Sequence, residues 1–155
     1  MRILLIEDNP ADASLISDLF KLKYPKGTLI CRNTLRTAID DLSINNYNLI
    51  LLDLGLPDSD GLKTYIRLRG ETTLPIVILT GNRDEKLALR AVKAGAQDYL
   101  NKGSEGSMLF RSINFAIERH ARNDNLNSVK TKADYNKAID SLKTCVQNIN
   151  TYIDN

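Results

Sequence analysis

The chain has 155 residues, 43% of them hydrophobic and 26% charged, which is enough for one domain with a buried core plus an appendage but too few for two ordinary domains. The net charge of +2 and the aromatic content of 6% give no reason to expect a nucleic acid or an acidic membrane as partner. The cysteines Cys31 and Cys145 are far apart, without a neighbouring ligand at metal-binding spacing, which argues against a zinc site or a disulfide framework. Because no apolar run is long enough to span a membrane, we expect a soluble, cytoplasmic protein.

Five short apolar segments alternate with stretches of helical spacing. In chain order the predicted elements are strand 2–6, helix 11–23, strand 28–31, helix 35–45, strand 48–53, helix 62–69, strand 75–80, helix 85–94, strand 97–100 and helix 105–120. Two of the strands, with the cores 3–6 and 49–52, are apolar without alternation, as in a parallel sheet covered by helices on both faces. Asp58 and Asp60 are interpreted as turn formers before the helix that Gly61 opens. The pattern predicts an α/β fold with a doubly wound, five-stranded parallel sheet.

The last third of the chain is predicted to be helical but interrupted once. There is no Pro after Pro75 and no Gly after Gly106, so nothing in residues 107–155 forces a helix to stop. An Asn-rich patch over 122–127 has little apolar character, and it contains residues able to cap a new helix. We therefore place a first domain at 1–122 and a C-terminal helical extension at 123–155.

The predicted extension carries one apolar stripe. Its members recur at spacings of four and three, which puts them on one face of a helix; they are Tyr135, Ile139, Leu142, Val146, Ile149 and Ile153. Three interpretations are open: a frayed, solvated tail, a helix folded back on the first domain, or a helix packed against a second subunit or a partner. The last, which includes a homodimer through this helix, is slightly favoured.

Polar residues follow the predicted strands at one edge of the sheet, where ligands of such folds bind. Glu7 and Asp8 follow the first strand, Asp53 ends the third, Thr80 ends the fourth and Lys102 comes just after the fifth. Three carboxylates in one shallow pocket repel one another unless a cation joins them, and Mg²⁺ prefers such oxygen ligands. An ionised Asp53 needs no general base to attack a phosphoryl group if a metal and an amine neutralise the incoming charge.

This set of residues, in this order, resembles the receiver domain of two-component response regulators over residues 1 to about 120. The further residues that carry the resemblance are Tyr99, the run Leu52-Asp53-Leu54-Gly55-Leu56-Pro57, and Asp60-Gly61. The resemblance implies a flavodoxin-like fold of the receiver type. It also implies phosphorylation by a sensor histidine kinase or a phosphotransfer protein, and a downstream protein target.

The resemblance also implies roles for individual residues. Asp53 is then the phosphoacceptor and, with Asp8, a direct Mg²⁺ ligand. Glu7 acts mostly through metal-bound water, and the backbone carbonyl of Gly55 is a further ligand. Lys102 and Thr80 contact the phosphoryl group, and Tyr99 is the aromatic residue that rotates when Thr80 moves.

One position departs from the family pattern, and another bears on the hydrolysis of phosphorylated Asp53. Gly103 stands where the family usually has Pro after the lysine, which leaves the backbone conformation at Lys102 open. Asn82 is small and neutral, and the Gly55 side of the pocket is open. Water is therefore expected to reach a phosphorylated Asp53, which favours a short phosphoryl lifetime.

Other functions fit the sequence less well. A phosphatase of the haloacid dehalogenase type needs a second acid two residues after the nucleophile, where this chain has Gly55. A nucleotide-binding module lacks its motif, because neither G-x-G-x-x-G nor G-x-x-x-x-G-K-[ST] occurs,. The residues after 122 are too few for a winged-helix DNA-binding domain. We therefore expect a switch, or a phosphorelay intermediate, that signals through protein contacts without a DNA-binding output domain. We do not expect an enzyme, apart from a receiver's catalysis of its own phosphotransfer and dephosphorylation.

Overall fold

The computed structural model describes residues 1–81 and 85–153, and it describes the side chains of these residues except for 85, 88, 129 and 144–153. The chain forms two compact units, Met1–Glu118 and Arg119–Asn155. None of the described helices is long and apolar enough to cross a membrane.

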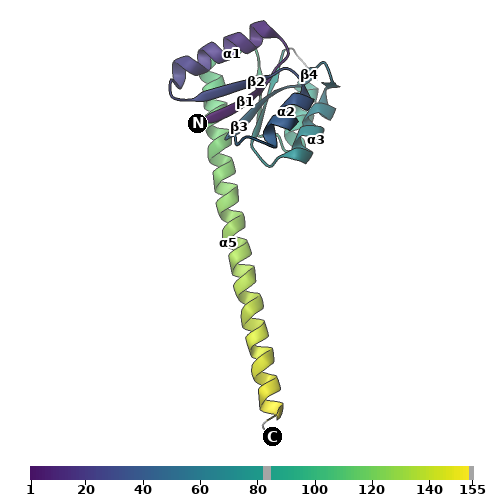
Figure 1. Cartoon of the computed structure of the whole chain (residues 1–155), viewed down its shortest axis with the longest axis vertical. Helices are drawn as coiled ribbons and strands as arrows, with labels where there is room; N and C mark the ends of the chain where they lie inside the picture. The colour runs from purple at the N-terminus through teal and green to yellow at the C-terminus, as the bar shows by residue number, and fades with distance from the viewer. Residues whose placement is uncertain (82–84, 154–155) are drawn as a thin grey trace. The chain divides into compact units, whose positions relative to one another are not determined.

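The first unit contains a parallel sheet of five strands in the order β2-β1-β3-β6-β7 (Figure 1). The strands are β1 (Arg2–Ile6), β2 (Thr28–Arg32), β3 (Leu49–Asp53), β6 (Ile76–Thr80) and β7 (Asp98–Asn101). The helices are α1 (Pro10–Lys23), α2 (Leu35–Leu42), α3 (Leu62–Glu71), α4 (Glu85–Lys93) and α5 (Gly106–Ile153), whose first part belongs to this unit. The predicted doubly wound, five-stranded parallel sheet is confirmed.

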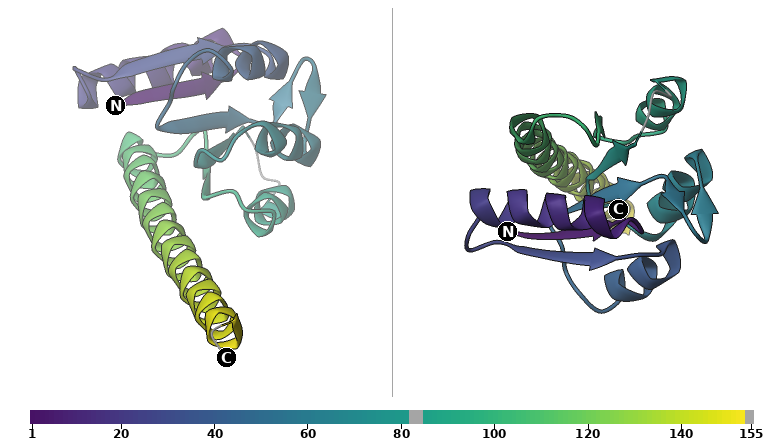
Figure 2. Two further views of the ribbon diagram at one scale, coloured as in Figure 1. Left: turned by 60° about the horizontal axis from the view of Figure 1, so that its bottom comes forward. Right: turned by 90° about the horizontal axis from the view of Figure 1, so that it is seen from above.

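Each face of the sheet has its own apolar core because successive side chains of a strand point to opposite faces. Along β1, Leu4 and Ile6 pack with residues of α2, α3 and α4, whereas Ile3 and Leu5 pack with residues of α1 and the start of α5. Figure 2 shows the same layering from two further directions. All four of these β1 side chains are fully buried, so the sheet is a rigid platform for the residues that follow its strands.

A short hairpin that the sequence prediction missed lies between β3 and α3. Its strands are β4 (Gly55–Leu56) and β5 (Ser59–Asp60), which pair antiparallel. At its tip the carboxylate of Asp58 accepts hydrogen bonds from the backbone N–H groups of Leu35 and Arg36, both at 2.9 Å. Asp58 was interpreted as a turn former, but its side chain also caps the first turn of α2 from a distant part of the chain. Strands of two residues have no periodicity by which a sequence could reveal them.

The second unit corrects one prediction: the expected interruption of the helix at the Asn-rich patch 122–127 is wrong. Helix α5 runs without a break over Gly106–Ile153. Asn and Asp only weaken a helix, unlike Pro, and here polar side chains find partners within it. His120 Nε2 lies 3.3 Å from Asp124 Oδ2, and the Ser128 hydroxyl donates to the carbonyl of Asn125 at 2.8 Å. The domain division at 122 stays a prediction.

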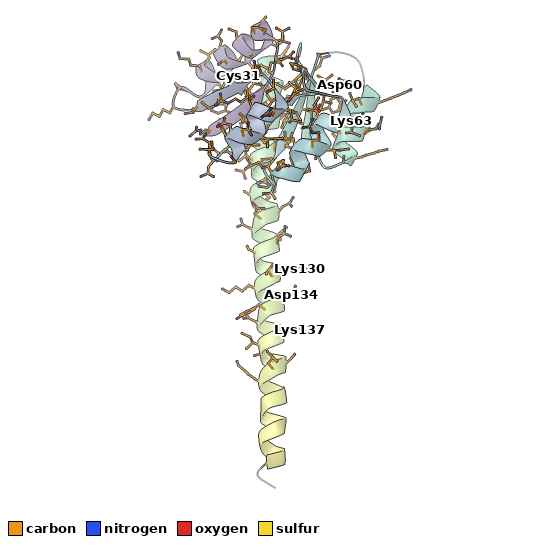
Figure 3. All side chains as sticks on the ribbon, turned by 45° about the vertical axis from the view of Figure 1, so that its right-hand side comes forward. Cys31, Asp60, Lys63, Lys130, Asp134 and Lys137 are labelled. Carbon is orange, nitrogen blue, oxygen red and sulfur yellow. The ribbon has the colours of Figure 1, made fainter. Side chains whose placement is uncertain are left out.

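The stripe of the second unit is described only in part. Tyr135 is 65% exposed and Leu142 66%, while Ile139 is partly buried. The side chains of Val146, Ile149 and Ile153 lie outside the described residues, as does that of Cys145. Elsewhere on this helix, charged side chains such as those labelled in Figure 3 are exposed; these are Lys130, Asp134 and Lys137.

Candidate phosphoacceptor site

The strand register brings the predicted site residues to one edge of the sheet. Ile6 is level with Leu52, and Asp53 is level with Leu79, so the residues after β1 lie beside the end of β3. Thr80 is level with Asn101, which places Lys102 just beyond the neighbouring strand end. The backbone N–H of Lys102 donates to the carbonyl of Thr80 at 2.9 Å. The edge is therefore held by the same parallel ladder that forms the sheet.

Three carboxylates meet at this edge. Glu7 is 1% exposed, Asp53 is 9% exposed and Asp8 is exposed. One oxygen from each lies within 4.8 Å of the others. Carboxylate oxygens that close together repel one another, and hard oxygen donors are what Mg²⁺ binds. The donor set therefore fits a divalent cation.

Lys102 is the cation of the cluster. Its Nζ lies 2.6 Å from Glu7 Oε2, 2.6 Å from Asp53 Oδ2 and 3.1 Å from Asp12 Oδ2. Burial alone would lower the pKa of Lys102, but its contacts with the carboxylates of Asp53, Glu7 and Asp12 outweigh burial and hold the pKa well above its usual range,. The amine is therefore charged throughout the physiological range and carries a positive charge to the edge.

Glu7 and Asp53 are each anchored by a backbone amide. Glu7 Oε1 accepts the N–H of Asn9 at 3.0 Å, and Asp53 Oδ1 accepts the N–H of Gly55 at 3.1 Å. Burial raises the pKa of Glu7, and its contacts with Lys102 and Asn9 offset this only in part. Asp53 thus presents one oxygen to an amide and the other to the ammonium group.

Thr80 and Tyr99, the two predicted switch residues, take part in none of the described ion pairs of this cluster. Thr80 is half-buried at the end of β6, next to the strand end that carries Lys102. Tyr99 is 38% exposed on the edge strand β7. Asn82, considered in relation to water access, lies outside the described residues.

The backbone around Lys102 is a turn held by Asn101. The Asn101 side chain accepts the N–H of Gly103 at 3.0 Å, and its carbonyl accepts the N–H of Ser104 at 2.8 Å. Among the described residues no peptide bond is cis, and Gly103 does not have a positive φ. This segment therefore places Lys102 without the proline that is usual in similar proteins.

One further acid, Asp12, contacts Lys102 and was not predicted from the sequence. It lies in the first turn of α1, after the N-cap residue Asn9, whose side chain accepts the N–H groups of Ala11 and Asp12. An acid in a first helical turn is ordinarily explained by the helix dipole. No local pattern indicates its contact with Lys102, which lies 90 residues away in the sequence.

Comparison with known proteins identifies the family. Residues 3–114 match the model of the response regulator receiver domain. The chain belongs to this family of receiver domains. Over 101 residues it is 36% identical to the transcriptional regulatory protein KdpE of Staphylococcus aureus, covering 65% of this chain and 43% of that protein. Over 134 residues it is 31% identical to the response regulator ArlR of Staphylococcus haemolyticus, covering 85% of this chain and 60% of that protein.

A solved structure agrees with these relatives. The crystal structure of a two-component response regulator from Clostridium difficile is 26% identical, with a TM-score of 0.68, and the match covers 77% of this chain and 97% of that one. Receiver domains are phosphorylated signalling domains that bind Mg²⁺ at an acidic pocket and interact with histidine kinases or phosphotransfer proteins. This receiver domain spans 43% to 60% of the length of the two curated relatives.

Proposed function

We propose that this chain is a phosphorylation-dependent switch that accepts a phosphoryl group on Asp53, with Mg²⁺, from a sensor histidine kinase or a phosphotransfer protein. The observation that carries the proposal is the pairing of Asp53 Oδ2 with the Lys102 ammonium at 2.6 Å, beside two further carboxylates. A lone acid at a strand end is ordinarily structural. An acid with a partly buried cation on one side and a cation-binding set of oxygens on the other is equipped for phosphoryl transfer.

The chemistry follows from the two oxygens of Asp53. The ionised carboxylate attacks the phosphorus of a phosphohistidine, forming an acyl phosphate while the nitrogen–phosphorus bond breaks and its electrons return to the imidazole. Lys102 neutralises charge on the phosphoryl oxygens, and Thr80 donates its hydroxyl to one of them. Asp8, Asp53 and the carbonyl of Gly55 would hold Mg²⁺, with Glu7 acting through metal-bound water, and the ion would supply charge neutralisation. The same residues would support hydrolysis of the acyl phosphate.

Phosphoryl labelling tests this proposal. Purified protein is incubated with acetyl phosphate, or with a phosphorylated histidine kinase, in Mg²⁺ or in a chelator. We expect acid-stable, base-labile incorporation only with the metal, and none in Asp53→Asn. Asp60→Asn is the matched control, since Asp60 (labelled in Figure 3) is an exposed acid of the hairpin that takes part in none of the described ion pairs. Labelling that persists in Asp53→Asn would contradict the assignment.

Thr80 and Tyr99 are proposed to convert the phosphorylated state into a change at the surface of α4, β7 and the start of α5. Such a switch needs two states that phosphate favours unequally. Thr80→Ala is expected to be labelled on Asp53 and yet fail to convert. The measurement is the set of amide chemical-shift changes over residues 85–118 on adding Mg²⁺ and beryllofluoride. Changes identical to those of the wild type would contradict the relay.

The output is proposed to be a protein contact made by the helical extension. The apolar side chains of Tyr135 and Leu142 are more than half exposed on this helix. An isolated helix in water cannot bury them, so they are available for contact with another protein surface. A second copy of this chain presents the same stripe, so a homodimer covers it on both helices. Action without a DNA-binding output belongs to this proposal, and a role as phosphorelay intermediate is its alternative; both need only protein partners.

Mass measurement in solution tests the homodimer. We expect a dimer for the full chain and a monomer after truncation at residue 122 or in Leu142→Asp with Val146→Asp, with labelling of Asp53 unchanged. Asn136→Asp adds one negative charge, against two in the stripe variant, at an exposed position off the stripe and is expected to leave the dimer intact. The same number of chains per particle for truncated and full-length protein would leave the solvated tail or the folded-back helix as the explanation.

A further inference from the structure

Asp12 makes a contact that its place in the helix does not require. It lies three residues after the N-cap residue Asn9, where an acidic side chain commonly turns back to accept the N–H of the N-cap residue,. Here that N–H donates instead to Glu7 Oε1 at 3.0 Å. Asp12 is therefore free of the capping role, and its Oδ2 accepts a hydrogen bond from Lys102 Nζ at 3.1 Å.

The Lys102 ammonium has as many acidic neighbours as it has protons. A lysine side chain carries three N–H donors. Carboxylate oxygens of Glu7, Asp12 and Asp53 lie within 3.1 Å of Nζ, although the contact with Glu7 Oε2 is an ion pair that is not aligned as a hydrogen bond. A phosphoryl oxygen that needs this ammonium group must therefore share it with these acids or displace one of them.

The three acids differ in how easily they give up the lysine. Glu7 has a fully buried side chain, and a buried carboxylate without its cation is strongly unfavourable,. Asp53 is the residue that carries the phosphoryl group. Asp12 has a side chain that is 35% exposed, and its contact is the longest of the three. Water can replace Lys102 at Asp12 at little cost in free energy.

We propose that Asp12 is a positioning residue that holds Lys102 in the unphosphorylated state and competes with the phosphoryl group for it. The proposal rests on the proposed function of Asp53 and Lys102. Phosphorylation then exchanges one ion pair for another: the contact from Lys102 to Asp12 opens as the contact from Lys102 to a phosphoryl oxygen forms. Asp12 lowers the occupancy of the phosphorylated state by this competition, and it connects the site to the first turn of α1.

The affinity for beryllofluoride, a mimic of the phosphoryl group, measures the competition directly. The full chain is titrated with beryllofluoride at saturating Mg²⁺, and binding is followed by amide chemical shifts. Asp12→Asn is expected to bind about twofold to fivefold more tightly than the wild type, the range that an exposed ion pair provides. Asp60→Asn removes a charge from the hairpin beside Gly55 without touching Lys102, so it reports the general effect of charge and is expected to change the affinity less.

Two further measurements make the test specific. Urea unfolding without metal is expected to show that both variants fold. A crystal structure of the wild type with Mg²⁺ and beryllofluoride is expected to show Lys102 bonded to fluoride and Asp12 Oδ2 beyond hydrogen-bond distance. Equal affinities for Asp12→Asn and Asp60→Asn, weaker binding by Asp12→Asn, or an intact contact between Lys102 and Asp12 in that complex would overturn the proposal. If the wild type binds no beryllofluoride and is not labelled on Asp53, the proposed function fails instead.

Discussion

Two polar networks in the first unit differ in the ratio of acids to their donor partners. One surrounds Asp41, near the amino ends of β1 and β3, where every partner is a donor. Its Oδ1 accepts the Asn45 amide at 2.6 Å, and its Oδ2 accepts the Tyr47 hydroxyl at 2.7 Å and lies 3.1 Å from the Arg32 guanidinium. Arg2 extends this network by donating to the Asn45 side chain at 3.1 Å. One carboxylate thus meets three donors, one of which is the Arg32 cation, and the charge of Arg2 also acts on it.

In the network at the carboxyl ends of the strands, several acids share one cation. There one ammonium group, that of Lys102, serves Glu7, Asp12 and Asp53, and Asp8 lies beside them without a described ion pair. The pKa values reflect the contrast. Burial would raise the pKa of Asp41, but its hydrogen bonds and the charges of its arginines lower it, whereas burial prevails at Glu7 and raises its pKa.

The difference shows where this fold trades stability for function. A buried carboxylate whose two oxygens both have donor partners is a structural element, because its charge is already compensated within the fold. A cluster with more acids than cations carries unbalanced negative charge, and a bound divalent cation relieves it. Removing an acid should therefore have opposite effects on the free energy of unfolding at the two sites.

The largest effect is expected at the satisfied site. Asp41→Ala removes the common partner of Asn45, Tyr47 and Arg32 and leaves the buried Tyr47 hydroxyl without its acceptor. We expect the free energy of unfolding to fall by about 3 kcal/mol, the usual scale for breaking a buried charged network. Urea denaturation measures this effect. Asp40→Ala, at the exposed neighbouring position, is the matched control and should change stability little; equal losses in the two variants would refute the structural role of the network.

A smaller effect of opposite sign is expected at the incomplete site. Asp8 is the acid of the cluster without a described ion pair to Lys102, so Asp8→Asn removes repulsion and loses no such contact. We expect the metal-free protein to gain about 1 kcal/mol in free energy of unfolding. Asp53→Asn should gain less, because it also loses its bond to Lys102.

Adding Mg²⁺ separates this explanation from a general improvement in stability. The wild type is expected to gain stability with Mg²⁺ by mass action, and Asp8→Asn to gain much less because it lacks a ligand. Denaturation midpoints with and without Mg²⁺ give both differences. A lower midpoint for metal-free Asp8→Asn, or an equal response to Mg²⁺, would mean that the acids do not repel one another as described.

The sequence predicts the incomplete site around Asp53 and Lys102 better than the satisfied site around Asp41. Residues at the ends of apolar strands are easy to locate, because the strand pattern itself marks the edge to which Asp53 and Lys102 belong. Asp41 lies on the buried face of α2, three residues after the buried Ala38. This helical spacing is the one sequence pattern that indicates a buried acid here. Its partners come from separate segments, so no local pattern reveals them. Asp12 was missed for the same reason.

The helix boundary of α5 and the β4–β5 hairpin show two other limits. Asn and Asp residues at 122–127 indicate a weaker helix, but intrinsic propensity is a weak predictor when polar side chains find partners within the helix. The hairpin depends on a tertiary contact, the bonds from Asp58 to the first amides of α2. In both cases specific side-chain contacts, which residue type alone does not reveal, decide the local structure.

The smallest expected effect is the pH dependence of the satisfied site. The folded-state pKa of Asp41 is lowered, so the unfolded chain binds this proton more readily than the folded one. The stability contributed by the ionised Asp41 is therefore fully present above its unfolded pKa, about 3.9, and is lost as the pH falls through the folded value. We expect the stability gap between the wild type and Asp41→Ala to be constant from about pH 7 to pH 5 and to narrow below about pH 4. Urea denaturation across this range, with Asp40→Ala as control, measures the gap; narrowing already between pH 7 and pH 5 would mean that the pKa of Asp41 is raised rather than lowered, and that its network is no better satisfied than the cluster around Lys102.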